Sequence, residues 1–305
     1  LPSNSLHSMA HDRAGNRYFA TDEGLALLSN DVWTSFTTDD GLADNTVRDI
    51  LIDREGHVWC ATPMGVSRYD GNSWQTYRGD GDLIDQHVNR IALGPDGDLW
   101  FATQQGLSRY LAGVWTSFGI DDGLGDNAIN DVTVTPDGTV WAATNKGLSR
   151  YADGNWTTHT TIDGMVHNHV TSLGVGNDGS IWVGTSHGLS RLEDEIWSSW
   201  TGEEGLLSEQ VLSVSPGSDN SMWITTNVPG GVHRITDDDQ IESIPVGQYE
   251  QIYQRHDLDC ENIPAADPIP SDWGDSAVLI PDPYTCYGAI TKRVYEEPGM
   301  GTWFI

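Results

Sequence analysis

The chain has 305 residues and a formal net charge of −30, with 45 acidic against 15 basic side chains. A surface of this sign repels phosphate backbones, so nucleic acid is not expected as a partner. No apolar run approaches the ~18 residues that a membrane helix needs, so we expect no membrane span within the chain. The sequence begins with Leu1 and shows no signal-like segment, and we expect it to be a processed or excised portion of something longer.

Tryptophan recurs along the chain with a fixed period of 41 residues. Two series keep this step and together hold ten of the 13 tryptophans. They are Trp59, Trp100, Trp141, Trp182 and Trp223, and Trp33, Trp74, Trp115, Trp156 and Trp197. Periods of about 40 to 45 residues with four strand-like segments are typical of propeller blades. The sequence therefore predicts an all-β fold, a β-propeller of four-stranded antiparallel blades.

Residues 41–80 show the expected blade most clearly. Residues 47–52 are rich in β-formers and predict the first strand, which lines the central channel. The second, third and fourth strands are predicted over 57–62, 66–69 and 74–77. Short segments rich in Gly, Pro, Asp and Asn separate them, as antiparallel hairpins require.

We expect one domain over 1–305, with six clear blades over 1–40, 41–80, 81–122, 123–163, 164–204 and 205–247. A divergent seventh blade is predicted over 248–305. Its first strand is Tyr249–Tyr253, and an insertion follows at 258–275. Its other strands are predicted over 276–280, 288–295 and 302–305. Seven blades are favoured, and the alternative is six blades followed by a packed tail.

The turn between the first and second strands has Gly in five copies and Asn in the sixth. These residues are Gly15, Gly56, Gly97, Gly138, Gly179 and Asn220. Gly and Asn are the residues that best tolerate positive φ, so we predict positive φ at this position. The pattern indicates that the backbone must adopt positive φ at this turn position, and it does not indicate a calcium-binding loop.

A few aromatic and cysteine residues fall outside the repeat. Trp200 and Trp273 belong to neither series and are predicted to be exposed. Cys60 follows a strand tryptophan and is predicted to be a buried free thiol. Cys260 and Cys286 lie in the irregular C-terminal part, and a disulfide between them would suit an extracytoplasmic location.

Residues 45–77 follow the pattern Asn45-x-Val47-x-x-Ile50-x-x-Asp53-x-x-Gly56-x-x-Trp59-x-Ala61-Thr62-x-x-Gly65-Val66-Ser67-Arg68-Tyr69, then Trp74 and Tyr77. The segments Gly106–Tyr110 and Gly147–Tyr151 repeat its third-strand part. This pattern resembles the two-component regulator propeller repeat over residues 1 to about 235. The resemblance implies a bacterial extracytoplasmic module, periplasmic or secreted. Such repeats are typical of sensor regions of hybrid histidine kinases, whose propellers recognise carbohydrate fragments.

The turns between the second and third strands vary from copy to copy, while the frame around them repeats. This variation predicts ligand-binding residues at Gln104, Gln105, Asn145, Lys146 and His187. Neutral drift is the alternative explanation. One position of the first strand adds Arg48, Asn89 and Asn130, and polar groups that converge at a channel mouth are the usual sign of a pocket.

The connections between blades add carboxylates at the same end of each blade. Asp39, Asp40, Asp121 and Asp122 are a candidate metal site, with Ca²⁺ as the ion, and a solvated acidic rim is the alternative. No other cofactor is expected. The predicted partner is a small molecule or oligosaccharide that is uncharged or cationic, or else a protein.

An enzyme is the competing hypothesis. Propellers also serve as lyases and hydrolases, which need a base near an acid or a metal. His167, His169 and His187 are the nearest set, and scattered loop histidines are the alternative. We assign no catalytic residue from the sequence and favour a binding module.

Overall fold

The structure is a computed structural model that describes residues 2–79, 81–217, 219–227, 230–236 and 238–245, together with strands at 277–279, 294–297 and 301–304. The chain divides into two compact units, which we describe separately. The first consists of Leu1–Asp163 and Asn168–Val170, and the second of Gly164–His167 and Thr171–Ile305.

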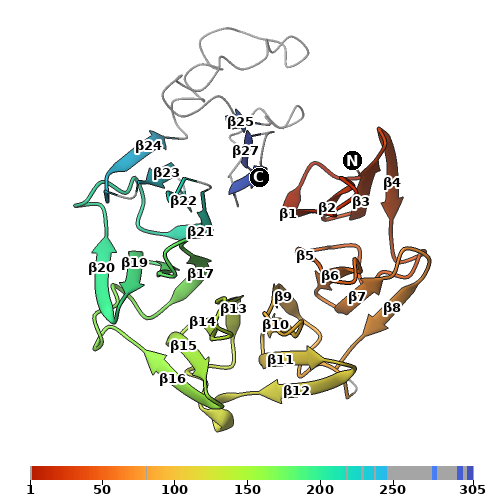
Figure 1. Ribbon diagram of the computed structural model, residues 1–305, viewed down its shortest axis with the longest axis horizontal. Coiled ribbons are helices and arrows are strands. Elements are labelled where there is room, and N and C mark those ends of the chain that lie inside the picture. Colours follow the sequence, from red (N-terminus) through yellow and green to blue (C-terminus); the bar gives the residue numbers. More distant parts are fainter. Residues whose placement is uncertain are drawn as a thin grey trace, which may run out of the picture. The chain divides into compact units, whose positions relative to one another are not determined.

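The first unit contains four sheets, each with four strands that pair in chain order (Figure 1). The first sheet is β1 (Leu6–His11), β2 (Arg17–Thr21), β3 (Gly24–Ser29) and β4 (Val32–Phe36). The second is β5 (Asp49–Ile52), β6 (Val58–Thr62), β7 (Gly65–Tyr69) and β8 (Trp74–Tyr77). The third is β9 (Val88–Leu93), β10 (Leu99–Thr103), β11 (Gly106–Leu111) and β12 (Val114–Phe118). A 3₁₀ turn, η1 (Ile120–Asp122), leads to β13 (Ile129–Val134), β14 (Val140–Thr144), β15 (Gly147–Ala152) and β16 (Asn155–His159).

The second unit continues with two four-stranded sheets of the same order (Figure 1). One is β17 (Val170–Val175), β18 (Ile181–Thr185), β19 (Gly188–Glu193) and β20 (Ile196–Trp200). The other is β21 (Val211–Pro216), β22 (Met222–Thr226), β23 (Gly231–Ile235) and β24 (Ile241–Pro245).

These six sheets are the blades of the predicted β-propeller, and we number them 1 to 6 in chain order, with strands a to d in each. The strands predicted over 57–62, 66–69 and 74–77 are confirmed within one residue as β6, β7 and β8. The first strand of this blade begins at Asp49 and not at Val47. The reason is that the Val47 amide donates to the Thr21 carbonyl of the preceding blade, at 2.8 Å.

The core of each blade centres on strand b, which is buried along its whole length in blades 2 to 6. Trp59 and Trp100 are only 1% exposed. Their rings stack on aromatic residues of strand d, Tyr77 and Phe118, with ring centroids 5.6 and 5.5 Å apart. Aromatic stacking thus joins the inner half of a blade to its outer edge.

Trp200 was predicted to be exposed, and this prediction is wrong because the residue is buried. It stacks on Trp182, with ring centroids 5.1 Å apart and 17° between the ring planes. The position has a period of its own, which mixed residue types conceal: Phe36, Tyr77, Phe118, His159 and Trp200. Trp200 is therefore the blade 5 member of the strand d aromatic position.

In blades 2 to 5 the serine of the repeated Gly-Leu-Ser-Arg segment (Gly-Val-Ser-Arg in blade 2) binds the connection that enters the blade. Four copies accept a backbone amide at 2.8 to 3.0 Å. The pairs are Ala43 with Ser67, Ile84 with Ser108, Gly125 with Ser149, and Val166 with Ser190. Each serine spans 24 residues of chain, so it ties a long connection to a buried strand.

We expect Ser108→Ala to destabilise the protein by about 1 to 2 kcal/mol, because the Ile84 amide loses its acceptor. Ser117→Ala is the matched control, since Ser117 lies directly opposite Ser108 on strand β12 and is exposed. Urea unfolding of both variants measures the difference. Equal midpoints for the two would contradict the fastening role.

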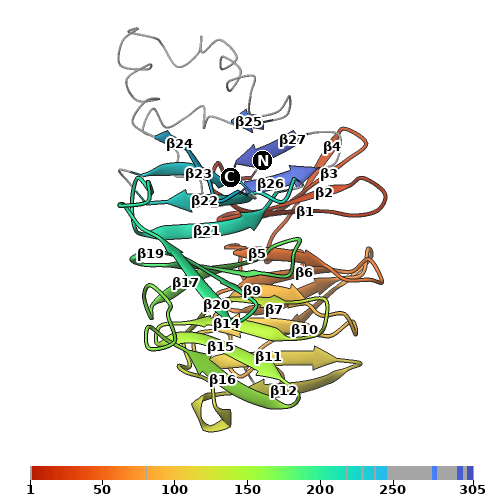
Figure 2. The same ribbon diagram turned by 60° about the vertical axis from the view of Figure 1, so that its left-hand side comes forward.

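The C-terminal part contains a three-stranded sheet of β25 (Ala277–Leu279), β26 (Val294–Glu297) and β27 (Gly301–Phe304) (Figures 1 and 2). Its order is β25-β27-β26, and β25 runs parallel to β27. Strands were predicted close to these ranges, but an antiparallel order in sequence was expected, and that order is wrong for these strands. Residues 280–300 separate β25 from β27, and a separation of this length allows a parallel pairing, which a short hairpin cannot make. Tyr249–Tyr253 lies outside the described residues, and the seventh blade stays a prediction.

The part of the chain that the structure describes contains no helix with the length and apolarity that a membrane crossing needs.

Candidate functional site

In each blade, the b–c turn and the connection from the preceding blade lie at one end, which we call the connection end. In blade 4 it comprises residues 119–128 and 145–146. The a–b and c–d turns lie at the other end, the turn end, which in blade 4 comprises residues 135–139 and 153–154. The candidate ligand-binding residues all belong to connection ends.

The b–c turns are held by a threonine and a glycine and not by the two residues between them. In blade 3 the Thr103 hydroxyl donates to the Gly106 carbonyl at 2.7 Å and accepts from the Gln105 amide at 3.2 Å. Thr144 and Gly147 repeat the arrangement in blade 4. Because the frame needs only the backbone of the two central residues, their side chains are free to vary. Gln104, Gln105, Asn145 and Lys146 are all exposed.

The polar position of strand a links neighbouring blades. Arg48 Nη1 donates to Asn89 Oδ1 at 2.7 Å, and Asn89 Nδ2 donates to the Ile129 carbonyl at 2.8 Å. Asn130 Nδ2 continues the series to the Val170 carbonyl at 2.7 Å. In the second unit Thr171 repeats it toward Val211, at 2.8 Å. These half-buried groups therefore have a structural role, which the sequence did not predict.

The series of polar residues on strand a also contacts one of the variable b–c turns. Asn130 Nδ2 donates to Asn145 Oδ1 at 3.0 Å, so two of the predicted ligand-binding residues are hydrogen-bonded to each other. The Lys146 ammonium pairs with Asp126 at 3.0 Å while its side chain stays 72% exposed. Asn130, Asn145 and Lys146 thus form one contiguous polar patch at the connection end of blade 4.

The carboxylates of the connections are used as turn caps. Asp40 Oδ2 accepts from the Thr37 amide at 2.8 Å, and Asp122 Oδ2 accepts from the Gly119 amide at 2.7 Å. Backbone donation from Thr160 holds the pKa of Asp163 below its ordinary value in the same way. Asp39 and Asp121 are exposed beside the capping residues. A Ca²⁺ site at these four predicted aspartates stays a prediction.

Two of the three predicted histidines of blade 5, His167 and His187, lie close together. The rings of His167 and His187 lie with centroids 4.2 Å apart, and Ser186 Oγ is 3.0 and 2.9 Å from their Nδ1 atoms. His169, the third predicted histidine, is exposed. The sequence indicated the two histidines but not the serine that joins them.

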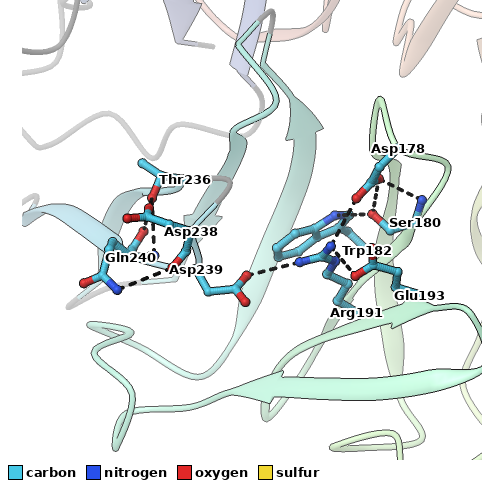
Figure 3. Close-up of polar contacts among 9 residues, drawn as sticks. All are labelled: Asp178, Ser180, Trp182, Arg191, Glu193, Thr236, Asp238, Asp239 and Gln240. Carbon is cyan, nitrogen blue, oxygen red and sulfur yellow. Dashed lines mark hydrogen bonds and ion pairs between the residues drawn. The ribbon is translucent and has the colours of Figure 1, made fainter.

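The turn ends are occupied by structural contacts. In blades 2 to 6 an arginine of strand c lies over a tryptophan of strand b, at 5.3 to 5.8 Å from the ring centroid. Figure 3 shows the blade 5 example, where Arg191 pairs with Asp178, Glu193 and Asp239 beside Trp182. Asp239 belongs to the c–d turn of blade 6, so the arginine also joins two blades. The arginine of the repeat is therefore a packing and ion-pair residue.

One turn end gathers three metal-ligating side chains, Asp53, Glu55 and His57, whose ligand atoms lie within 4.8 Å of one another. The Asp53 carboxylate already accepts from the Glu55 and His57 amides and from Trp59 Nε1. Arg68 Nη2 lies 2.9 Å from His57 Nε2. A guanidinium at this distance disfavours a cation, so the group is better explained as part of the turn.

Cys60 is a buried free thiol, as predicted, and burial raises its pKa. Cys260 and Cys286 lie outside the described residues.

Four-stranded antiparallel sheets that recur every 41 residues and are joined by these ladders define a β-propeller. Residues 41–64 and 164–187 match the family described as two component regulator propeller. The chain therefore carries repeats of this family, and the resemblance seen in the sequence is confirmed.

Solved structures give the same fold. The extracellular domain of a protein assigned as a hybrid two-component system of B. thetaiotaomicron is similar over 100% of this chain and 39% of its own, with a TM-score of 0.73 at 20% identity. A second such domain of that organism gives a TM-score of 0.67 at 21% identity, over 79% of this chain and 36% of its own. This chain thus spans well under half of either protein.

A virginiamycin B lyase from Staphylococcus aureus is similar over 80% of this chain and 85% of its own, with a TM-score of 0.66 at 16% identity. Likeness at these identities shows the fold alone. No curated protein sequence matches the chain.

Proposed function

We propose that the chain is an extracytoplasmic recognition module that binds an uncharged or cationic oligosaccharide at the connection ends of blades 3 and 4. The observation that supports the proposal is that, in the b–c turns, the residues that hold the turn differ from the residues that face solvent. Thr103, Gly106, Thr144 and Gly147 hold the turns, while the residues between them are exposed amides and one lysine. Exposed side chains that the frame of the turn does not need are the ones that selection can fit to a ligand.

The chemistry of these residues favours hydroxyl-rich ligands. Gln104, Gln105 and Asn145 each offer both a donor and an acceptor, which suits sugar hydroxyls. The net charge of −30 disfavours polyanions. Lys146 supplies one positive charge beside Asp126, so a single carboxylate on the ligand, as in a uronic acid, is compatible with the patch.

The location is supported by the comparisons. Both similar domains of B. thetaiotaomicron are extracellular, and the matched repeat is that of two-component regulators. A sensing role in the whole protein follows if the chain is one part of such a system. The alternative ligand of such a recognition module is a protein.

A calorimetric screen of neutral, cationic and uronic-acid oligosaccharides tests the proposal. We expect the Gln105→Ala, Asn145→Ala double variant to weaken binding by about tenfold or more, because two hydrogen bonds near 1 kcal/mol each are lost. The matched control is Asn72→Ala with Asn155→Ala, two exposed amides at turn ends.

Equal binding by wild type and the site variant would show that the ligand binds at another site.

The competing enzyme hypothesis, a lyase or hydrolase, makes a different prediction. It rests on the Ser186 hydroxyl within hydrogen-bond reach of two imidazoles, which resembles a nucleophile and its base. Turnover of a bound ligand that His167→Ala abolishes would favour the enzyme over the recognition module.

A further inference from the structure

Blade 5 differs from the other blades in the chemistry of its connection end. His167, from the connection that enters the blade, and His187, from the b–c turn, lie with ring centroids 4.2 Å apart and 30° between the ring planes. Ser186 Oγ is within 3.0 Å of Nδ1 on both rings. Two imidazole nitrogens therefore converge on one small polar point, within the second unit.

The equivalent positions of blade 4 hold an ordinary ion pair. Residues 41 positions earlier are Asp126 and Lys146, whose charged atoms are 3.0 Å apart. In blades 2 to 4 the residue equivalent to His167 is always an aspartate that accepts the amide two residues further on. These aspartates are Asp44, Asp85 and Asp126.

Relative to blade 4, blade 5 therefore replaces both the capping aspartate and its lysine partner with histidine. The fold does not require this, since three blades show that aspartate serves the turn. Two isolated histidines would need no explanation, but two that change together and meet in space point to a shared function.

We propose that His167 and His187 bind a divalent first-row transition metal ion, with Zn²⁺ or Ni²⁺ as the ions that fit. Imidazole nitrogen suits these ions, whereas Mg²⁺ and Ca²⁺ prefer oxygen ligands. An ion about 2.0 to 2.1 Å from each Nδ1 takes the place of the Ser186 hydroxyl oxygen, on which both nitrogens converge, once the Ser186 side chain changes rotamer and the two nitrogens move closer to that point.

The coordination sphere of this site is open. Among the described residues, no third imidazole, thiol or carboxylate completes a group of three with this pair. Water then fills the remaining positions, as in sites where a metal exchanges ligands and not in closed structural sites. The inference is independent of sugar binding at blades 3 and 4, because it concerns other residues and another unit.

The test is a calorimetric titration of the full chain without an affinity tag, using Zn²⁺, Ni²⁺ and, as a control, Mg²⁺. The main variant is His167→Asp with His187→Lys, which installs the blade 4 pair in blade 5. A second variant, His187→Gln, introduces the residue that blade 3 has at this position. His57→Asn removes a ligand from the competing turn-end group.

We expect about one Zn²⁺ or Ni²⁺ ion per chain, no comparable Mg²⁺ binding, and at least tenfold weaker binding in both blade 5 variants, since even outer-shell changes cost about 10- to 100-fold. His57→Asn should bind as wild type does. The ion should also raise the Tm of wild type and leave that of the double variant unchanged.

Several results would overturn the proposal. They are no Zn²⁺ or Ni²⁺ binding by wild type, binding retained by both blade 5 variants, or binding lost only in His57→Asn. Unfolding curves of the unliganded variants identify any that fail to fold, and His187→Gln, the smaller change, then decides.

Discussion

Replacing Gly106 with alanine is expected to lower the free energy of unfolding by about 3 kcal/mol, whereas Gly97→Ala in the same blade should lower it by about 1 kcal/mol. Both glycines have positive φ, +140° for Gly106 and +84° for Gly97. The value for Gly97 is close to the left-handed region that alanine can adopt, whereas the value for Gly106 is far from it, so backbone strain and lack of space both make the Gly106 substitution the costlier one.

The surroundings of the two positions differ sharply. A Cβ on Gly106 would lie 2.4 Å from the Phe118 carbonyl oxygen, which is backbone and cannot move aside without breaking the pairing of β11 with β12. A Cβ on Gly97 meets no atom within 4 Å. The crowding is general, because the b–c glycines Gly24, Gly65, Gly147 and Gly188 are 2.3 to 2.7 Å from the corresponding carbonyl.

Urea unfolding of the two variants measures the effect, and the result that counts is the gap between them. Equal destabilisation would mean that strand d moves outward at little cost and that the close approach is unimportant. Gly138→Ala, at the a–b turn of blade 4, should behave like Gly97→Ala because only the Pro95 side chain comes within 4 Å of its Cβ position, at 3.6 Å.

The two glycine positions show how far the sequence could predict the fold. Positive φ at Gly56, Gly97, Gly138 and Asn220 is confirmed, at 90°, 84°, 89° and 64°. The Asn in the sixth copy was the informative substitution, since it shows that a side chain fits there. The b–c glycines recur as regularly, but only coordinates reveal the carbonyl that excludes a side chain.

The candidate site was less accessible to sequence reasoning. Arg48, Asn89 and Asn130 share a position in the repeat, so their common place in strand a followed from the period. The partners of Asn89 and Asn130 did not, because a backbone carbonyl 40 residues away has no influence on residue type. Ser186 was missed for a similar reason, since its contacts depend on side-chain rotamers. The strand d aromatic position also has the 41-residue period, but its mixture of Phe, Tyr, His and Trp concealed that period.

The last prediction concerns a buried histidine that departs from the repeat. His233 occupies the strand c position where blades 2 to 5 have serine, and it is 0% exposed. Its Nδ1 lies 2.7 Å from the Ser243 hydroxyl and its Nε2 lies 3.1 Å from the Thr226 hydroxyl. Burial lowers the pKa of His233 from 6.5 to about 4, because the charged ring loses its hydration.

The sign of the pH effect follows from this direction. Between pH 6.5 and about 4 the unfolded chain binds a proton at this residue and the folded chain does not. The contribution of His233 to the free energy of unfolding is therefore complete above pH 6.5. It decreases as the pH drops through this window, by about 3 kcal/mol in all. Carboxylates with lowered pKa, such as Asp137, lose their contribution at lower pH.

His233→Ser, which installs the residue of the other blades, should remove this slope while leaving the carboxylate contribution intact. The measurement is the free energy of unfolding of wild type and variant at several pH values from 7.5 to 4. Wild type is expected to lose stability relative to the variant as the pH falls, whatever the cost of the smaller side chain at neutral pH. Parallel curves would show that His233 takes up its proton in the folded state, and the ring would then have access to water that the structure denies it.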